Sequence, residues 1–284
     1  METQKTIKKK FSLEGKGLQT GKPARAVFLP GKENEGVIFI RKDLEGRPAA
    51  RLKDMLNFDT DRRSRIDFGR GEYVETVEHV LAALWGAEID NIKIELNGPE
   101  IPALDGSSLE FLKAFVKNGT KTQNAAKEFV NIKNPVWAED GESFLGVFPS
   151  NNFRISYVLE YPGRVIGRQF FSGVITPEIF REKIAPARTF CLKQEAEALL
   201  KRGYGRGADF SNTLVMDEKG PIDNVLRFSD EPVRHKVLDL IGDLCLLGRS
   251  LKGRVVAVRS GHKLNLELVK LLRSKAAPRA IRET

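Results

Sequence analysis

Cysteine is nearly absent from this sequence, since the 284 residues contain only Cys191 and Cys245. Two cysteines cannot build a disulfide framework or a cysteine-rich zinc module, and their apolar neighbours predict two small core residues in a reducing compartment. Long apolar runs are missing too, because no stretch approaches the roughly 18 residues that cross a bilayer. The basic start at residues 5–10 leads into Phe-Ser-Leu-Glu-Gly rather than into an apolar signal segment. We therefore expect a cytoplasmic protein with at most peripheral membrane contact.

Acidic residues are fewer than basic ones. The chain has 38 Asp and Glu against 47 Lys and Arg, which gives a formal net charge of +9. Such an excess favours anionic partners, which include nucleic acid, phosphorylated metabolites and anionic membrane surfaces. No aromatic-basic RNA motif or recognition-helix pattern accompanies the charge, so we expect no nucleic-acid partner. A basic nucleic-acid-binding protein is kept as the alternative from a different class, and we expect a monomer.

The apolar periodicity predicts an α+β fold, in which helices are layered on β-sheets. Helices are predicted at residues 76–86, with Thr76 as N-cap, at residues 108–117, and from near Val233 onward. Gly- and Pro-bounded strand signals occur in both halves of the chain. They lie at residues 26–29, 37–40, 92–96, 144–148, 153–159 and 255–259.

The second half of the chain repeats the order of elements in the first, which favours two similar domains. The polar segment at residues 118–127 is the expected linker. Domain I is predicted at residues 1–122 with a small basic, turn-rich insert at 51–73, and domain II at residues 128–284 with a strand-helix-strand insert at 187–216. Domain I carries Glu78 and His79, and domain II carries His235, Asp239, Asp243 and His262.

The three histidines of the chain suggest a metal site. Around His235, the carboxylates Asp239 and Asp243 recur every four residues and share one helical face. A His and an Asp at i and i+4 can meet one cation, although a charged stripe is more often a solvated face. Catalytic zinc commonly takes three protein ligands, and the cysteines are unsuited, so the third ligand is His79 or His262. Spacing alone does not choose between them.

The neighbours of these histidines suggest acid-base chemistry. Glu78 adjoins His79, as in zinc hydrolases where a carboxylate beside a ligand takes a proton from water. His262 lies between a predicted strand and a predicted helix at residues 264–272, and a partner such as Asp243 would keep it protonated near neutral pH. The alternative for each histidine is a packing or capping role.

Several longer motifs occur in a fixed order. They are Thr76-Val-Glu-His-Val-Leu-Ala-Ala-Leu, Gly98-Pro-Glu-Ile-Pro-Ala-Leu-Asp-Gly-Ser, Ala187-Arg-Thr-Phe, Leu226-Arg-Phe-Ser-Asp-Glu-Pro-Val-Arg-His-Lys-Val-Leu-Asp-Leu-Ile-Gly-Asp-Leu and Ser260-Gly-His-Lys-Leu-Asn. Over nearly the whole chain, these motifs resemble the zinc-dependent UDP-3-O-acyl-N-acetylglucosamine deacetylases of lipid A biosynthesis, the LpxC family.

The resemblance implies an enzyme with its active site between two similar α+β domains. It implies Zn²⁺ bound by His79, His235 and Asp239. The implied reaction is hydrolysis of the N-acetyl group of UDP-3-O-(3-hydroxyacyl)-N-acetylglucosamine, which releases acetate. The implied partner is therefore a UDP-linked acylated amino sugar.

The same resemblance implies roles for further residues. Glu78 would activate the attacking water, and His262, oriented by Asp243, would stabilise charge and protonate the departing amine. Thr189 would help to hold the oxyanion, and the insert at residues 187–216 would form a passage for the fatty acyl chain. The expected substrate-binding residues are Lys236, Phe190, Leu18 and Tyr161.

One departure from the family pattern falls near the amino end. The family usually has a histidine within Gly-Leu-His-Thr/Ser-Gly, where this chain has Gln19. Glutamine keeps hydrogen bonding but cannot titrate near neutral pH. Changes at this position and in both inserts leave a related metallo-deacetylase with a drifted substrate as the alternative enzyme.

Overall fold

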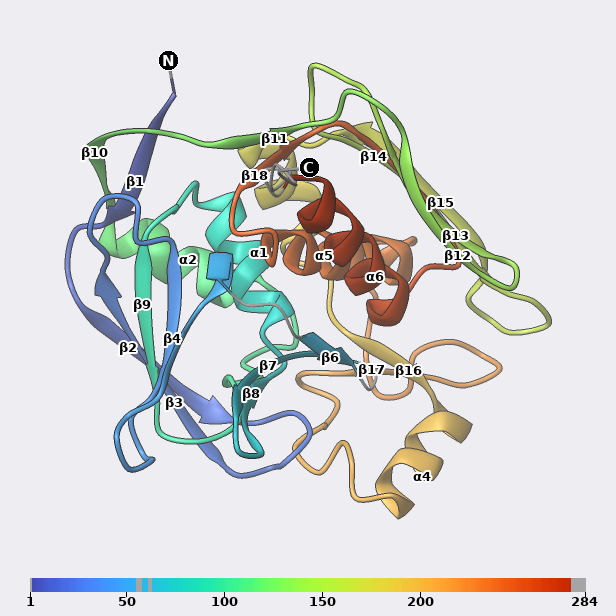
Figure 1. Cartoon of the computed structure of the whole chain (residues 1–284). Coiled ribbons are helices and arrows are strands. Elements are labelled where there is room, and N and C mark those ends of the chain that lie inside the picture. The colour runs from blue at the N-terminus through green and yellow to red at the C-terminus, as the bar shows by residue number, and fades with distance from the viewer. Residues whose placement is uncertain (1, 55–57, 61–62, 277–284) are drawn as a thin grey trace.

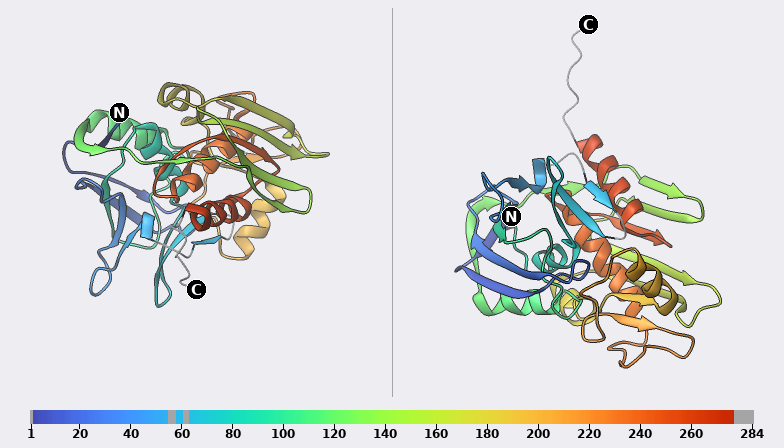
Figure 2. Two further views of the ribbon diagram at one scale, coloured as in Figure 1. Left: turned by 45° about the horizontal axis from the view of Figure 1, so that its top comes forward. Right: turned by 90° about the horizontal axis from the view of Figure 1, so that it is seen from below.

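The computed structural model describes residues 2–54, 58–60 and 63–276. Its two largest sheets have five strands each. They lie toward opposite sides of the molecule, with most of the helices between them, whereas α4 (Lys193–Lys201) projects at the lower right of Figure 1 (see also Figure 2). Helices α1 (Glu78–Gly86) and α5 (Glu231–Cys245) pack against each other at the centre of this arrangement.

The first sheet confirms the predicted strands of the amino-terminal half. Its order is β2 (Phe11–Lys16), β3 (Pro23–Pro30), β9 (Ile92–Leu96), β4 (Val37–Arg41) and β5 (Ala49–Arg51). Only β9 and β4 run parallel, and the other neighbours are antiparallel. Alternate residues such as Phe28 and Ile94 are fully buried, which places one face of the sheet in the core. Helix α2 (Leu109–Asn118) follows β9.

The second sheet has the same topology as the first. Its order is β12 (Val136–Asp140), β13 (Ser143–Phe148), β19 (Arg254–Val258), β14 (Arg154–Tyr161) and β15 (Gly167–Val174). Again only the third and fourth strands in this order are parallel. Helix α5 precedes β19 and α6 (His262–Ala276) follows it, as α1 and α2 flank β9. The mixed α/β architecture agrees with the predicted α+β class, while the division into two domains stays a prediction.

Two pairs of short strands lie where the first half of the chain passes into the second. Strand β1 (Thr3–Ile7) pairs with β10 (Thr120–Ala126), and β11 (Phe129–Asn131) pairs with β18 (Ser250–Lys252). Strand β10 occupies most of residues 118–127, the segment predicted as the linker, and its role between two domains stays a prediction. Its polar residues form a strand that is paired along only one edge.

Both inserts form regular structure. The first contains the 3-10 turn η1 (Leu52–Asp54) and an antiparallel sheet of β6 (Phe58–Thr60), β7 (Ser64–Gly69) and β8 (Glu72–Glu75). The second insert follows α3 (Pro177–Ile179) and the π-helical turn η2 (Phe180–Ile184). It consists of β16 (Phe190–Leu192), α4 (Lys193–Lys201) and β17 (Leu214–Met216), which confirms the predicted strand-helix-strand order.

Two local predictions were wrong. Thr76 does not cap α1, because Val77 is the N-cap and the Thr76 hydroxyl instead donates to Glu100 Oε1 at 3.1 Å. Cys191 and Cys245 are half-buried rather than core residues. The sequence also predicts a frayed tail at residues 276–284, and this segment lies almost wholly outside the described residues. In the described part of the chain, no helix combines the length and apolarity needed to cross a membrane.

Candidate metal centre and active site

The site forms where the start of α1 meets the polar stripe of α5. The two helices touch backbone to backbone, because a Cβ atom built on Gly242 would lie only 2.1 Å from the carbonyl oxygen of Glu78. Only glycine permits this approach. Glu78 and His79, the first two residues of α1, therefore lie against the face of α5 on which polar residues recur every four positions.

Two imidazoles and one carboxylate converge at this crossing. Ligand atoms of His79, His235 and Asp239 all lie within 4.8 Å of one another, and the three residues are buried. The Nε2 atoms of His79 and His235 are 3.7 and 3.2 Å from Asp239 Oδ1. Of the two histidines that spacing left open as third ligand, His79 is the one in this group.

The protonation states of the group suit a divalent cation. Burial lowers the pKa of His79 to about 3 and also lowers that of His235, so both rings are neutral with a free lone pair. His235 Nδ1 lies 3.0 Å from the Ala187 carbonyl, to which it donates, and Nε2 is left for a ligand. Burial would raise the pKa of Asp239, but His235 and Lys236 beside it lower the pKa and keep the carboxylate ionised.

Glu78 is a buried carboxyl next to this group. Burial raises its pKa, His262 opposes this effect, and Asp243 and Asp239 add to it, so that the pKa of Glu78 is about 7. The Ser64 N–H donates to Glu78 Oε2 at 3.2 Å. A carboxyl with a pKa near neutrality can accept a proton from water and release it again.

His262 and Asp243 form a buried ion pair. His262 begins α6, and its Nδ1 atom lies 2.8 Å from Asp243 Oδ2. Burial alone would lower the pKa of His262, but the attraction and hydrogen bond of Asp243 raise it to about 9. His262 is therefore a cation at neutral pH and can donate a proton from Nε2, which faces Asp239 at 3.8 Å.

Two polar residues at this site had no role in the sequence interpretation. Ser64, on β7 of the first insert, donates its hydroxyl to Asp243 Oδ1, and Asn265 Nδ2 donates to Asp243 Oδ2 at 2.8 Å. Asn265 follows His262 by three residues in a predicted helix, a spacing that could have revealed it. Ser64 gave no such signal, because it lies in a basic segment far away in the sequence.

Three of the expected substrate-binding residues gather beside His235. The Phe190 and His235 ring centroids are 6.3 Å apart, and Tyr161 packs edge-on against Phe190 at 6.0 Å. Lys236 Nζ lies 5.6 Å from the centre of the Phe190 ring. Thr189 directly precedes Phe190, and its N–H donates to the Gly106 carbonyl at 2.8 Å. This cluster forms one wall next to the metal group.

The fourth residue, Leu18, lies in a turn that is bound to the second insert. The Gly207 N–H donates to the Leu18 carbonyl at 3.0 Å, and the Gly205 N–H donates to Gln19 Oε1 at 3.1 Å. Leu18 itself is buried. The Gln19 side chain thus binds the second insert to the turn after β2.

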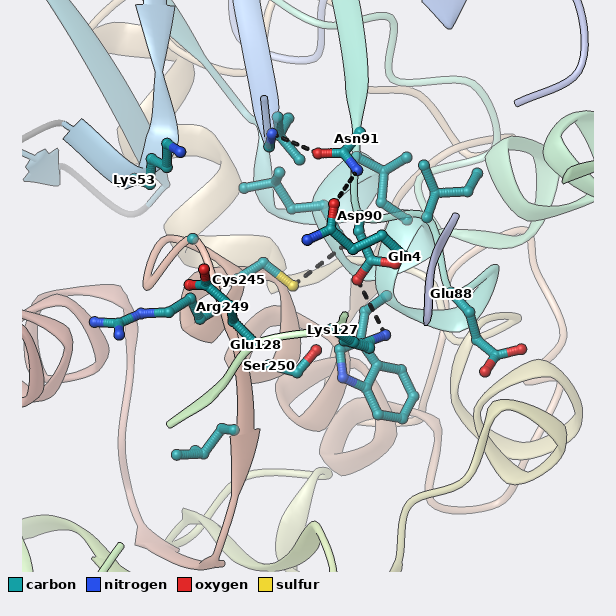
Figure 3. A pocket seen from close by; sticks show the side chains of 18 of the residues that line it. Gln4, Lys53, Glu88, Asp90, Asn91, Lys127, Glu128, Cys245, Arg249 and Ser250 are labelled. Carbon is teal, nitrogen blue, oxygen red and sulfur yellow. Dashed lines mark hydrogen bonds and ion pairs between the residues drawn. The ribbon is translucent and has the colours of Figure 1, made fainter. Parts of the chain in front are cut away.

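A separate cavity of about 120 Å³ lies between other parts of α1 and α5 (Figure 3). Part of its polar lining is internally paired: Asp90 forms an ion pair with Lys127 at 3.1 Å, and Asn91 donates a hydrogen bond to Gln4. Burial raises the pKa of the Cys245 thiol there to about 12, so the thiol stays neutral. None of the residues of the metal group lines this cavity.

Comparisons with known proteins identify relatives along nearly the whole chain. The family model described as LpxC, UDP-3-O-acyl N-acetylglycosamine deacetylase, matches residues 4–274. A protein of Chlamydia caviae named UDP-3-O-acyl-N-acetylglucosamine deacetylase is 42% identical over 267 residues, covering 93% of this chain and 95% of the relative. Proteins of the same name from Anaeromyxobacter sp. and Thermodesulfovibrio yellowstonii are 38% and 37% identical, covering 99% and 96% of this chain and 92% of each relative.

Proposed function

This chain belongs to the LpxC family of UDP-3-O-acyl N-acetylglycosamine deacetylases, and on that premise we propose how its residues carry out the reaction. The protein removes the N-acetyl group of UDP-3-O-(3-hydroxyacyl)-N-acetylglucosamine and releases acetate in lipid A biosynthesis. The observation that carries the proposal is the buried group of His79, His235 and Asp239, which has a base with a pKa of about 7 and an acid with a pKa of about 9 beside it.

The proposed cofactor is Zn²⁺, held by His79, His235 and Asp239. Two neutral imidazoles and one carboxylate match the ligand sets of catalytic zinc sites, which leave one coordination position open. When bound, the cation would polarise the amide carbonyl and lower the pKa of a water molecule. The lone pairs freed by burial of the two histidines support this assignment.

The residues of the chain divide the proton transfers between them. Glu78 takes a proton from the attacking water as the oxygen forms its bond to the acetyl carbon. His262, held protonated by Asp243, gives a proton to the sugar nitrogen as the C–N bond breaks, so the products are acetate and a free amine. We assign to Thr189 and Lys236 the stabilisation of the negative charge that develops on the carbonyl oxygen.

The surroundings support the proposed substrate. None of the nine residues of α4 is buried. Its apolar side chains therefore do not pack in the protein core and can contact an apolar ligand. We assign the second insert as the passage for the acyl chain, and Phe190 and Tyr161 as aromatic contacts to the sugar nucleotide. Leu18 would complete the wall on the other side.

The two halves of the chain would each form a domain, at residues 1–122 and 128–284. Each range holds one five-stranded sheet with the same strand order. Glu78 and His79 come from the first range and the other acid-base and ligand residues from the second, so the site would lie between the domains. A monomer acting in the cytoplasm fits this assignment, because a single chain supplies every group that the reaction needs.

The test is turnover of the named substrate by purified protein. Incubation with the UDP-linked acyl sugar should release free amine and acetate in equal amounts, and elemental analysis should find about one zinc per chain. His79→Ala and Asp239→Ala should both lose the metal and the activity. Release of acetate only from other N-acetyl sugars would favour a drifted substrate. Salt-dependent oligonucleotide binding without bound metal would favour the nucleic-acid alternative.

A further inference from the structure

The second sheet has an apolar face that no helix of the described residues covers. Its inner residues, such as Ile155, Tyr157 and Val255, are buried under α5 and α6. Because side chains alternate along a strand, the residues between them point away from the helices, to the outside of the molecule (Figure 1). The apolar members of this outer face are Trp137, Phe144, Phe148, Val158, Phe170, Val174, Val256 and Val258.

The strand register makes the outer face continuous. Phe144 lies opposite Val258, Val258 beside Val158, and Val158 opposite Phe170, so one apolar row crosses four strands. The rings of Phe144 and Phe148 close over Gly146, where a Cβ atom would lie 2.8 and 3.2 Å from them. Trp137 is 54% exposed and Phe170 is 61% exposed. A contiguous apolar patch of this kind marks an interaction surface.

Two arginines stand side by side at one end of this face. Arg154 on β14 lies beside Arg254 on β19, and both are exposed. Within the described residues, neither guanidinium has an ion pair or hydrogen bond. Like charges directly across a ladder are destabilising, so the pair would gain from a bound anion.

The carboxylates at the other end of the face mostly form ion pairs with neighbouring basic residues. Asp140 pairs with Lys263 at 2.6 Å, Glu142 with Arg259, and Glu160 with Arg168 at 2.5 Å. If this face packed against the same face of a second copy, the two arginines would need carboxylates of that copy. Among the described residues of the face, only Glu139 on β12 has no ion pair of its own to give up. The charge pattern therefore favours a partner that brings its own anions.

We propose that the outer face docks on an anionic phospholipid bilayer. Trp137 and Phe170 would enter the boundary between headgroups and acyl chains, where aromatic side chains are favoured. Arg154 and Arg254 would contact lipid phosphates at the edge of the patch. Each arginine near such a surface strengthens binding about fivefold, and salt weakens this part of the attraction.

The test uses the full chain with vesicles of phosphatidylcholine mixed with phosphatidylglycerol. The protein should sediment with these vesicles, bind less to phosphatidylcholine alone, and show a blue shift of tryptophan emission that is lost in Trp137→Phe. The double variant Arg154→Gln/Arg254→Gln should bind roughly 25-fold more weakly, and Phe170→Glu should also lose binding. Val116→Glu and Lys117→Glu, exposed changes on α2, are the matched controls and should bind as the wild type does.

Two results would overturn the proposal. One is sedimentation with vesicles that none of the outer-face variants weakens, or no sedimentation at all. The other is a dimer, seen by analytical ultracentrifugation, that Phe170→Glu dissociates while vesicle binding is absent, because the face would then be an interface between copies. Circular dichroism of every variant, together with deacetylase activity, confirms that the chain is folded. The proposal does not depend on the identity of the deacetylase substrate.

Discussion

The two halves of the molecule use one scaffold for different purposes. The middle strand of the first sheet, β9, reads Ile-Lys-Ile-Glu-Leu and points Lys93 and Glu95 outward. These charges are satisfied by Glu35 at 3.2 Å and Lys42 at 3.4 Å. The matching strand β19 reads Arg-Val-Val-Ala-Val and, after its first residue Arg254, is apolar on both faces. The shared fold therefore requires apolar residues only on the inner face of each sheet, and the residues of the outer face can differ between the two sheets.

The same contrast holds for the two central helices. Helix α1 is buried along nearly its whole length and contributes functional groups only at its first two residues, Glu78 and His79. Helix α5 carries a polar stripe, from His235 to Asp243, through an otherwise apolar helix. In the proposed mechanism, the first half supplies the base, and the second half supplies most ligands and the acid. Substitutions that remove one contribution at a time can separate these roles.

The largest effect is expected from removing the contribution of the first half. Glu78→Gln keeps the shape of the side chain but cannot accept a proton from water. We expect kcat to fall by roughly 10²–10⁴-fold, the range for loss of a general base. Metal content should be unchanged, because Glu78 is not one of the three ligand residues. Glu75→Gln is the matched control, since Glu75 is also buried but bonds Arg63. A loss of metal in Glu78→Gln would contradict the division of roles.

The acid of the second half should govern the alkaline side of the pH profile. Activity requires ionised Glu78, so it should fall as pH drops through the pKa of that group, at or below about 7 with a cation present. It also requires protonated His262, so activity should fall as pH rises toward about 9. His262→Gln should lower kcat by roughly 10²-fold and abolish the alkaline limb. Retention of that limb would show that another group supplies the proton.

The sequence predicted most of the scaffold and part of the site. Helical spacing placed His235, Asp239 and Asp243 on one face because such spacing is a local property of α5. It could not choose between His79 and His262, because that choice depends on the backbone contact at Gly242. The prediction of Thr76 as N-cap was wrong for a similar reason. Its hydroxyl donates a hydrogen bond to the buried carboxylate of Glu100, which is distant in sequence. The polar residues of β10 likewise form a strand because they pair with β1, which lies more than a hundred residues away in the sequence.

The contact between the halves should be sensitive to a single methyl group. Gly242→Ala would place a Cβ atom 2.1 Å from the Glu78 carbonyl oxygen, so α1 and α5 must move apart. Overpacking of this kind costs about 1–3 kcal/mol of unfolding free energy. Denaturant unfolding measures the change. Gly261→Ala is the control, since no atom lies within 4 Å of its added Cβ, and equal stability of the two variants would mean that the helices are not held at this crossing.

The smallest effect is expected from substitution of Ser64, the residue of the first half that contacts Asp243, the partner of His262 in the second half. Its hydroxyl donates to Asp243 and its N–H donates to Glu78, so it touches both the acid pair and the base. Ser64→Ala leaves one oxygen of a fully buried carboxylate without that donor, which costs about 1–3 kcal/mol where it is not relieved. We expect kcat to fall about tenfold, equivalent to about 1.4 kcal/mol, with KM and metal content unchanged. Ser64→Thr keeps the hydroxyl and should restore the rate, whereas a purely structural role would lower stability in Ser64→Ala without changing kcat of the folded enzyme.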